Sequence, residues 1–264
     1  DFIVFFKHGI NMTSMEDTML MSYVLDAGKN RHNMDTLSEI HLNHKTISFK
    51  DLVGTGKKEI NFSEVDVEKA KDYAAEDADI TFRLYKKFQK SLKDEKMINI
   101  YEIFEKPLLK ILAFMEIEGV KIDNKFLKSL STKFEKKIVK IQNEVFKISK
   151  KEFNIASPKQ LGEILYNDLK IADLKKTKKG SFATSASVLE DLAFKGHKFP
   201  QLVLDWRQVS KLKNTYSDSL PEHINPNTQR VHTSFLLAAT TTGRLASSDP
   251  NLQNIPIKSE DGKD

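Results

Sequence analysis

The sequence predicts a mostly α-helical protein of the α+β class. Several long segments repeat apolar residues every three or four positions, which is the period of a helix with one buried face. Only one stretch, residues 230–237 (RVHTSFLL), has the β-branched and aromatic content that is typical of a strand. The chain has 264 residues, of which 39% are hydrophobic, so it is long enough for one large domain or two small ones.

The first 95 residues are expected to form three helices joined by polar loops. Short apolar periods predict helices over 17–25 and 35–42, and a longer period predicts a helix over 65–92. The segment 53–62, "VGTGKKEINF", is typical of a loop because of its glycines and lysines. The chain opens directly on the apolar run "DFIVFFKHGI" and ends in eight mostly polar residues, so we expect it to be part of a longer protein.

Residues 96–225 are also expected to be helical. An apolar segment over 106–117 ends at a glycine, and Asp123 is expected to cap a long amphipathic helix. The capping box "SPKQ" at 157–160 predicts a helix through residue 169. Further helices are expected over 188–194 and from Pro200 onward, after a basic loop at 174–185. The apolar stripe of the long helix is typical of a core face, and it consists of Phe126, Leu130, Phe134, Ile138, Ile141, Val145 and Ile148.

Charge is divided unevenly along the chain. Residues 1–95 contain 14 Lys and Arg against 17 Asp and Glu, so of the totals of 42 and 37 the remaining residues hold 28 against 20. A basic half favours nucleic acid as a partner, although a lysine-rich composition alone explains it equally well. The sequence has no cysteine, no apolar run of eighteen residues and no signal-peptide pattern. A cytoplasmic protein without a membrane partner is therefore the default expectation.

Tyr73 and Asp77 are the first candidate catalytic pair. They lie four residues apart in "YAAEDADIT", within the helix predicted over 65–92, so the phenol and the carboxylate share one face. Such a pair suits metal-dependent phosphodiester hydrolysis, in which a carboxylate holds a divalent ion and a hydroxyl orients the attacking water. The spacing alone favours a simpler interpretation, a solvated face of a charged helix.

A resemblance supports the catalytic interpretation. The segments "DTMLMSYVLDAGKNRHNMDTLSEIHLNHKTISF" and "KAKDYAAEDADITFRLY" resemble the C-terminal half of the ribonuclease H-like proofreading exonuclease domain of bacterial family A DNA polymerases, the DNA polymerase I family. The resemblance implies that Tyr73 positions the nucleophilic water, and that Asp77 and Asp1 are metal ligands and catalytic residues. It implies that Asp17 is a helix cap near the site. The family's upstream Asp-x-Glu motif is missing, and Asp66 and Glu68 are expected only in the first turn of a helix.

The stretch 240–256, "TTTGRLASSDPNLQNIP", is the second candidate site. It has hydrogen-bonding groups at nearly every position but only two formal charges, Arg244 and Asp249. Copying DNA of any sequence requires donors that reach purine N3 and pyrimidine O2, which occupy nearly equivalent minor-groove positions in every base pair. Arg244 is a long cationic donor, and the neutral amides are those of Asn251, Gln253 and Asn254. Composition alone favours an ordinary polar loop.

Here too a resemblance favours DNA binding. The string "TGRLASSDPNLQNIP" resembles the family A segment that binds the primer-template minor groove just before the first catalytic palm motif, with Ala246 where Ser is usual. The string "KKTKKGSFATSASVLEDLA" resembles the tip of the thumb. The string "DWRQVSKLKNTY" resembles the base of the thumb, and contacts with the DNA backbone are implied for Arg207, Lys211, Lys213, Asn214 and Thr215. The implied domains are half of the exonuclease domain (1–95), the helical thumb (96–225) and the start of the palm, with a short β segment (226–264).

The resemblance as a whole implies a piece of a DNA-directed DNA polymerase with 3′-5′ proofreading, which acts in replication and repair. The complete enzyme would use Mg²⁺ or Mn²⁺ and deoxynucleotides, and its other partners would be primer-template DNA and a single-stranded 3′ DNA end. A monomer in the bacterial cytoplasm, associated with the nucleoid, is expected. Because the polymerase motifs of the palm and fingers are absent from the sequence, this piece is expected to bind DNA but to be inactive alone.

Two alternatives remain open. A stand-alone DnaQ-like 3′-5′ exonuclease would share Tyr73 and Asp77 but would not contain the 240–256 stretch. A non-enzymatic helical DNA-binding module would explain the basic half but not the set Asp1, Tyr73 and Asp77.

Overall fold

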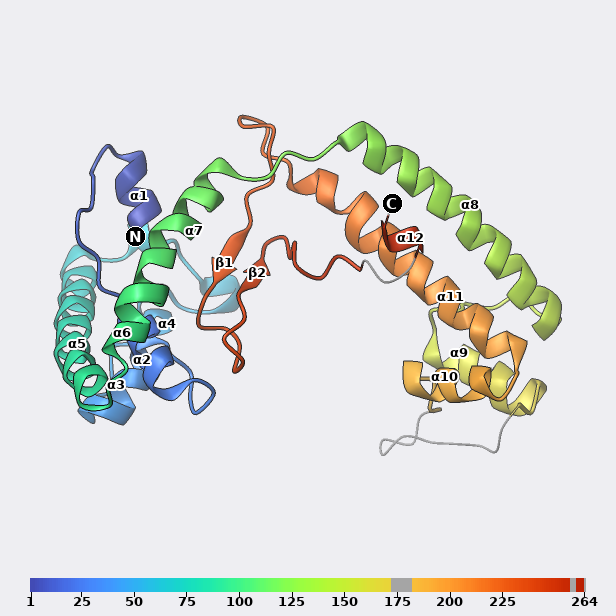
Figure 1. Ribbon diagram of the computed structural model, residues 1–264, viewed down its shortest axis with the longest axis horizontal. Coiled ribbons are helices and arrows are strands. Elements are labelled where there is room, and N and C mark those ends of the chain that lie inside the picture. Colours follow the sequence, from blue (N-terminus) through green and yellow to red (C-terminus); the bar gives the residue numbers. More distant parts are fainter. Residues whose placement is uncertain (172–181, 257–259, 264) are drawn as a thin grey trace. The chain divides into compact units, whose positions relative to one another are not determined.

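The structure, a computed structural model, describes residues 1–171, 182–256 and 260–263 (Figure 1). These residues form two compact units. Unit 1 contains residues 1–119 and 232–253, and unit 2 contains the described residues of 120–231 and 254–264. The chain therefore leaves unit 1, builds most of unit 2, returns to unit 1 and passes once more into unit 2.

Unit 1 consists of helices and one small antiparallel sheet. Its strands, β1 (Ser234–Leu236) and β2 (Ala246–Ser248), pair with Phe235 opposite Ser247. Its helices are α1 (Phe2–Lys7), α2 (Thr18–Asp26), α3 (Met34–Leu42), α4 (Phe49–Val53), α5 (Val67–Asp94), α6 (Ile98–Ile100) and α7 (Lys106–Glu118), with 3₁₀ turns at Gly56–Lys58 and Phe62–Glu64 and a π-helical turn at Tyr101–Glu105.

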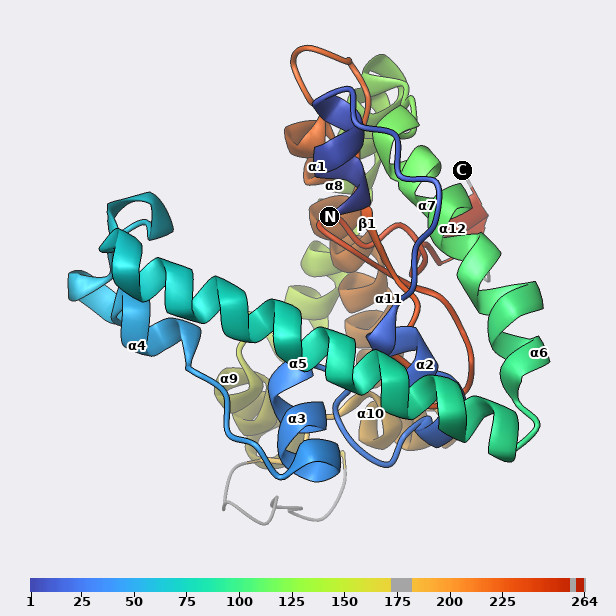
Figure 2. The ribbon, with the colours of Figure 1, turned by 90° about the vertical axis from the view of Figure 1, so that its left-hand side faces the viewer.

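Helix α5 organises the core of unit 1 because its apolar side chains recur every four residues on one face. Asp66 begins the helix by accepting a hydrogen bond from Glu68 N at 3.1 Å. The apolar face packs against α2 and α3, which lie beside α5 in Figure 2. The buried side chains of this core are Leu20, Met21, Leu37, Ile80, Leu84, Phe88, Leu92 and Tyr101.

Unit 2 is built around two long helices that pack along each other, α8 (Asn124–Ser149) and α11 (Lys198–Leu212) (Figure 1). Asp123 caps α8 by accepting a hydrogen bond from Phe126 N at 3.0 Å. The other helices are α9 (Pro158–Gly162), α10 (Ala186–Phe194) and α12 (Glu260–Lys263), with π-helical turns at Glu163–Asp168 and Lys213–Asp218 and a 3₁₀ turn at Leu220–His223.

The predicted fold class and the long helices are confirmed. The helix predicted over 65–92 is α5, and the helix predicted after Asp123 is α8. Asp17 caps α2 as expected, because its carboxylate accepts a hydrogen bond from Leu20 N at 2.9 Å. Ser157 likewise caps α9, but the α-helix predicted through residue 169 changes to a π-helical turn after Gly162.

Three predictions about segments need correction or lie outside the structure. The strand predicted over 230–237 is shorter, because Val231 forms isolated bridges with Val120 and Ile224 before β1 begins. The loop predicted over 53–62 overlaps the end of α4 at Val53 and the start of a 3₁₀ turn at Phe62, and it contains a further 3₁₀ turn at Gly56–Lys58. Most of the basic loop predicted over 174–185 lies outside the described residues. Among the helices that the structure describes, none combines the length and apolar character needed to span a bilayer.

Candidate functional site

Tyr73 and Asp77 lie one turn apart on α5, and both side chains are partly buried. Burial is the main cause that raises the pKa of Asp77; a hydrogen bond with Tyr73 opposes the rise, and the charges of Asp35 and Glu76 add to it. Burial and the neighbouring Asp77 carboxylate also raise the pKa of Tyr73, so its phenol stays protonated at neutral pH. Asp77 Oδ1 is buried and has no hydrogen-bond partner among the described residues. Asp77 Oδ1 can therefore accept a hydrogen bond or bind a cation, and the Tyr73 hydroxyl lies beside the same carboxyl group.

Two aromatic side chains that the sequence did not single out lie beside Tyr73. The ring centroids of Phe49 and Phe62 are 5.7 Å apart, and they lie 5.9 and 6.1 Å from the centroid of Tyr73. Phe49 is 47% exposed and Phe62 is 39% exposed. Exposed rings of this kind can stack nucleobases irrespective of sequence. We call Phe49, Phe62 and Tyr73 the aromatic cluster.

Asp1 lies in a different part of unit 1. It precedes α1, whose Phe2 and Phe6 rings pack edge-on against Phe114 of α7 with centroids 5.6 and 5.4 Å apart. Asp1 borders a cavity of about 400 Å³ whose other acidic lining residues are Glu16, Asp17 and Glu116. The structure thus brings Tyr73 and Asp77 together but does not add Asp1 to their cluster.

The described residues supply only some of the donor atoms that a catalytic divalent cation needs. Hydrolysis by two metal ions needs several carboxylates, and Asp77 Oδ1, buried and without a partner, is suited to be one ligand. Within the described ranges, however, no three His, Cys, Asp or Glu side chains are grouped so that they could hold a metal ion. The described residues therefore supply only part of a metal site, and the ligand roles of Asp1 and Asp77 stay predictions.

The turn that carries Arg244 is held by hydroxyl groups. Thr240 Oγ1 accepts a hydrogen bond from Arg244 N at 3.0 Å and donates one to Arg244 O at 2.8 Å. Tyr23 of α2 donates to Thr240 O at 2.7 Å and accepts from Gly243 N at 3.1 Å. The Arg244 guanidinium is exposed and forms no hydrogen bond or ion pair with a described residue. This cation is therefore available to a ligand on a fixed turn.

The rest of the 240–256 stretch also uses its polar groups to fix the backbone. Ser247 Oγ accepts a hydrogen bond from Leu252 N at 3.1 Å, and Asn251 Oδ1 accepts one from Gln253 N at 3.0 Å. The carbonyl of Asn254, which belongs to unit 2, accepts a hydrogen bond from the Tyr216 hydroxyl. The side chains predicted to bind DNA, those of Asn251, Gln253 and Asn254, belong to exposed residues.

The five residues predicted at the base of the thumb differ in exposure. Arg207 on α11 is partly buried and donates a hydrogen bond to Thr184 O at 2.8 Å, and burial lowers its pKa. Lys213 forms ion pairs with Asp218 at 2.8 Å and Glu135 at 3.3 Å. The other three residues, Lys211, Asn214 and Thr215, are exposed. Arg207 and Lys213 therefore already have partners within unit 2.

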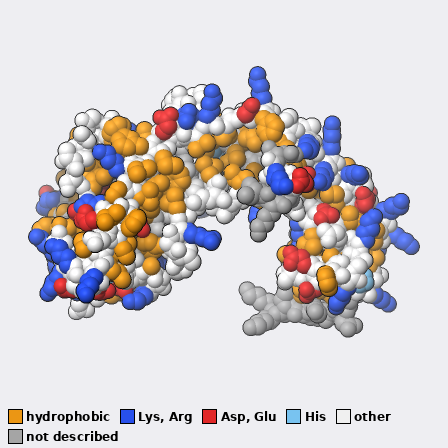
Figure 3. All heavy atoms as spheres, viewed as in Figure 1, with side chains coloured by type: hydrophobic (Ala, Val, Ile, Leu, Met, Phe, Trp, Pro, Cys, Tyr) orange, Lys and Arg blue, Asp and Glu red, His pale blue; other side chains and the backbone are white. Residues whose placement is uncertain are grey.

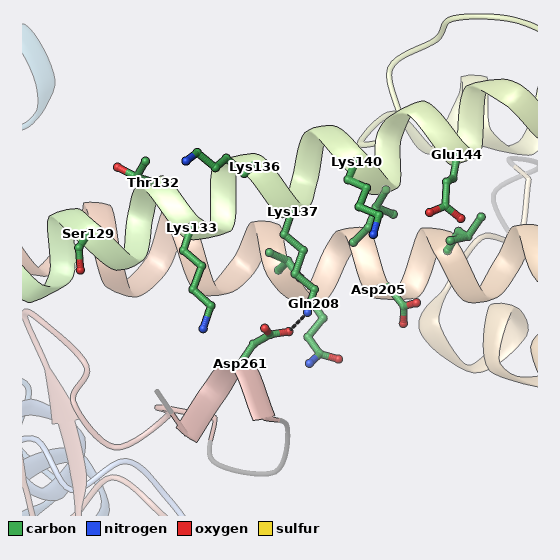
Figure 4. A pocket seen from close by; sticks show the side chains of 13 residues that line it. Ser129, Thr132, Lys133, Lys136, Lys137, Lys140, Glu144, Asp205, Gln208 and Asp261 are labelled. Carbon is green, nitrogen blue, oxygen red and sulfur yellow. Dashed lines mark hydrogen bonds and ion pairs between the residues drawn. The ribbon is translucent and has the colours of Figure 1, made fainter.

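A groove of about 880 Å³ between α8 and α11 adds basic residues that the sequence did not single out. Figure 4 shows Lys133 and Lys137 extending from α8 toward α12, where Lys137 pairs with Asp261 at 2.5 Å. Basic side chains also project along the surface over α8 in Figure 3. Their spacing of three and four residues was the available sequence signal. The groove lysines are Lys133, Lys136, Lys137 and Lys140.

Comparison with known proteins places these features in a family. The model of DNA polymerase family A matches residues 124–264, more than half of the chain, and a 3′-5′ exonuclease model matches residues 1–93. DNA polymerase I of Rhizobium leguminosarum is 47% identical over 263 residues, and that of Pseudomonas aeruginosa is 44% identical over 248. The matches cover 100% and 94% of this chain but 26% and 27% of those proteins, so the chain spans about a quarter of their length.

The fold leads to the same family. The POL domain of Pol1 from M. smegmatis, solved in complex with DNA primer-template and dNTP, is similar with a TM-score of 0.78 and 28% sequence identity. The similarity covers 97% of this chain and 41% of that one. The resemblance found in the sequence is confirmed: the chain belongs to DNA polymerase family A.

Proposed function

We propose that the complete protein is a DNA-directed DNA polymerase with 3′-5′ proofreading, acting in DNA replication and repair. The observation that carries the proposal is that one chain matches an exonuclease family over residues 1–93 and DNA polymerase family A over residues 124–264. A stand-alone exonuclease does not account for the second match, and a non-enzymatic DNA-binding module does not account for the first. The proposed domains are half of the exonuclease (1–95), the thumb (96–225) and the start of the palm (226–264).

The proposed nuclease chemistry is centred on α5. Tyr73 keeps its proton at neutral pH, so its hydroxyl can hold and orient a water molecule beside Asp77. Asp77 and Asp1 are the proposed ligands for Mg²⁺ or Mn²⁺ in the complete enzyme, in which such an ion supplies Lewis-acid chemistry. The aromatic cluster is the proposed contact for the bases of a single-stranded 3′ DNA end.

The proposed primer-template contacts are of two kinds. Exposed side chains of the 240–256 stretch, above all Arg244, probe minor-groove acceptors that all base pairs share. Lys211, Asn214 and Thr215, with the groove lysines, bind phosphates and give affinity without sequence preference. We propose that the complete enzyme also binds deoxynucleotides and acts as a monomer in the nucleoid-containing cytoplasm.

The nuclease assignment is tested by Asp77→Ala and Tyr73→Phe in the complete protein. Loss of a metal ligand should abolish digestion of a labelled single-stranded 3′ end, and loss of one hydroxyl should slow it by about 100-fold or more, the scale of one catalytic hydrogen bond or proton-transfer group. Primer extension on matched DNA should stay within about twofold of wild type, because the two activities belong to different domains. Rates are measured with excess Mg²⁺.

Tyr85→Phe is the matched control, since Tyr85 lies on the same helix and accepts a hydrogen bond from Gln89 at 2.8 Å. It should leave both activities unchanged. If Tyr73→Phe slows extension as much as digestion, or if Asp77→Ala still digests the 3′ end, the assignment of these residues to a separate nuclease site is wrong.

A further inference from the structure

The segment between α3 and α4, residues 43–48, is held by hydrogen bonds with side chains of two helices, α3 and α5. From α3, Ser38 Oγ donates a hydrogen bond to His44 O at 2.8 Å, and Asp35 Oδ1 accepts one from Thr46 Oγ1 at 2.7 Å. From α5, Glu76 Oε1 lies 2.7 Å from His44 Nε2, and Glu76 Oε2 accepts a hydrogen bond from Ile47 N at 2.6 Å. One carboxylate on α5 therefore makes two of these four contacts.

Glu76 lies within one turn of both residues of the candidate nuclease pair on α5. It directly precedes Asp77 and follows Tyr73 by three residues, which is one helical turn. Its side chain is 17% exposed.

The segment leads directly into the aromatic cluster. Ile47 N, held by Glu76, lies two residues before Phe49, which opens α4. The centroid of the Phe49 ring lies 5.9 Å from that of Tyr73 and 5.7 Å from that of Phe62. Since a ring that is 47% exposed has few packing contacts to fix it, the position of the Phe49 backbone depends on the tethered segment.

We propose that Glu76 is a positioning residue for the single-stranded 3′ end, and that it acts through His44 and Ile47 on the placement of Phe49. This inference rests on the proposed nuclease function of Tyr73 and Asp77. Glu76 itself touches neither substrate nor water in this proposal. Its role is to hold the stacking ring at a fixed distance from the residues that cut.

A purely structural role for Glu76 would destabilise unit 1 and lower every activity of the protein, whereas a positioning role should affect only the binding of the 3′ end. The buried core residues of α5 begin with Ile80, one turn beyond Glu76, and the segment that Glu76 holds contains no buried residue. Loss of the two hydrogen bonds should therefore loosen residues 43–49 without unfolding unit 1. Substrate affinity should change more than the rate of cleavage, because Tyr73 and Asp77 stay on α5.

The test uses the complete protein with Glu76→Ala, Phe49→Ala and the double variant, and kcat and KM are measured separately on a labelled single-stranded DNA. Glu76→Ala should raise KM by about tenfold, the scale of one or two charged hydrogen bonds, with kcat within about threefold of wild type. In the Phe49→Ala background, Glu76→Ala should change KM by less than about twofold, because the effects of two residues are not additive when one acts through the other. Glu68→Gln, an exposed acid in the first turn of α5, is the matched control and should change nothing.

Three results would overturn the proposal: unchanged KM in Glu76→Ala, a full additive effect in the double variant, or an equal loss of primer extension. His44→Gln provides a milder second variant that removes the imidazole partner of Glu76 and should also raise KM. Asp77→Ala is assayed in parallel. If it retains digestion, the proposed nuclease function fails; if it abolishes digestion while Glu76→Ala behaves as wild type, only the positioning role fails.

Discussion

At the scale of single residues, Arg207 and Lys211 look alike in the sequence but differ in the structure. Both are basic residues of α11 for which the family resemblance implies contact with DNA. Arg207 is partly buried and bonded to Thr184 O, whereas Lys211 is exposed. Without the Arg207 guanidinium, the carbonyl oxygen of Thr184 would lose its hydrogen-bond donor. Because an unpaired polar group costs free energy, Arg207 should contribute to stability in addition to any contribution to DNA binding.

We expect Arg207→Ala to lower the free energy of unfolding of unit 2 by about 1–3 kcal/mol, the cost of losing a hydrogen bond from a charged donor. Lys211→Ala, its neighbour on the exposed side, should change it by less than about 0.5 kcal/mol and should instead weaken binding to duplexes of every sequence. Urea unfolding followed by circular dichroism gives the first quantity, and fluorescence anisotropy of a labelled duplex gives the second. Unchanged stability of Arg207→Ala together with weaker binding would assign Arg207 to the DNA surface alone.

At the scale of elements, long amphipathic helices were predictable because one residue pattern sets both their period and their burial. For α5 the cap at Asp66 and the apolar residues spaced by four mark the start and the buried face. The sheet was harder to predict because β2 is the sequence "ASS", which has no strand pattern, and it pairs only where β1 lies beside it. Local sequence says little about a strand whose partner is remote.

The candidate nuclease site was likewise predictable only where its residues lie on one helix. Tyr73 and Asp77 share a helix face, so their spacing alone places them together. Phe49 and Phe62 come from α4 and a 3₁₀ turn, which lie before and after the 3₁₀ turn at Gly56–Lys58, and only the fold brings their rings to Tyr73. The partners of Arg207 and Lys213 were not predictable for the same reason, since Thr184 and Glu135 are remote in the chain.

Leu84→Ala tests whether α5 is the element on which unit 1 depends. Leu84 is fully buried, and its truncation should cost about 2–5 kcal/mol, because the surrounding helices cannot close the cavity completely. Phe82 lies on the same helix and is 58% exposed, so Phe82→Ala is the matched control and should cost less than about 1 kcal/mol. Equal losses in urea unfolding would contradict the packing described for α5.

At the scale of the whole molecule, acidic and basic side chains are divided between different tasks. The nuclease candidates lie in the acidic residues 1–95, where a cation can be held, and the groove lysines lie in the basic remainder, where phosphate can be held. Among the groove lysines, Lys136 and Lys140 form no ion pair with a described residue, whereas Lys137 is paired with Asp261. Unpaired cations release counterions on binding DNA without first breaking a contact within the protein.

The double substitution Lys136→Gln with Lys140→Gln should therefore flatten the salt dependence of DNA binding by the complete protein. Each lost phosphate contact reduces the slope of log K against log salt by about 0.9, so two lost contacts reduce it by about 1.8. The measurement is anisotropy of a labelled primer-template duplex between about 50 and 200 mM salt, the range over which phosphate contacts dominate affinity. The same reduction is expected for duplexes of unrelated sequence, because phosphates carry no sequence information. Lys90→Gln with Lys93→Gln, which removes two exposed charges of α5, is the matched control and should leave the slope unchanged. If the two double variants change the slope equally, the response reflects net charge alone, and the groove between α8 and α11 does not contact DNA.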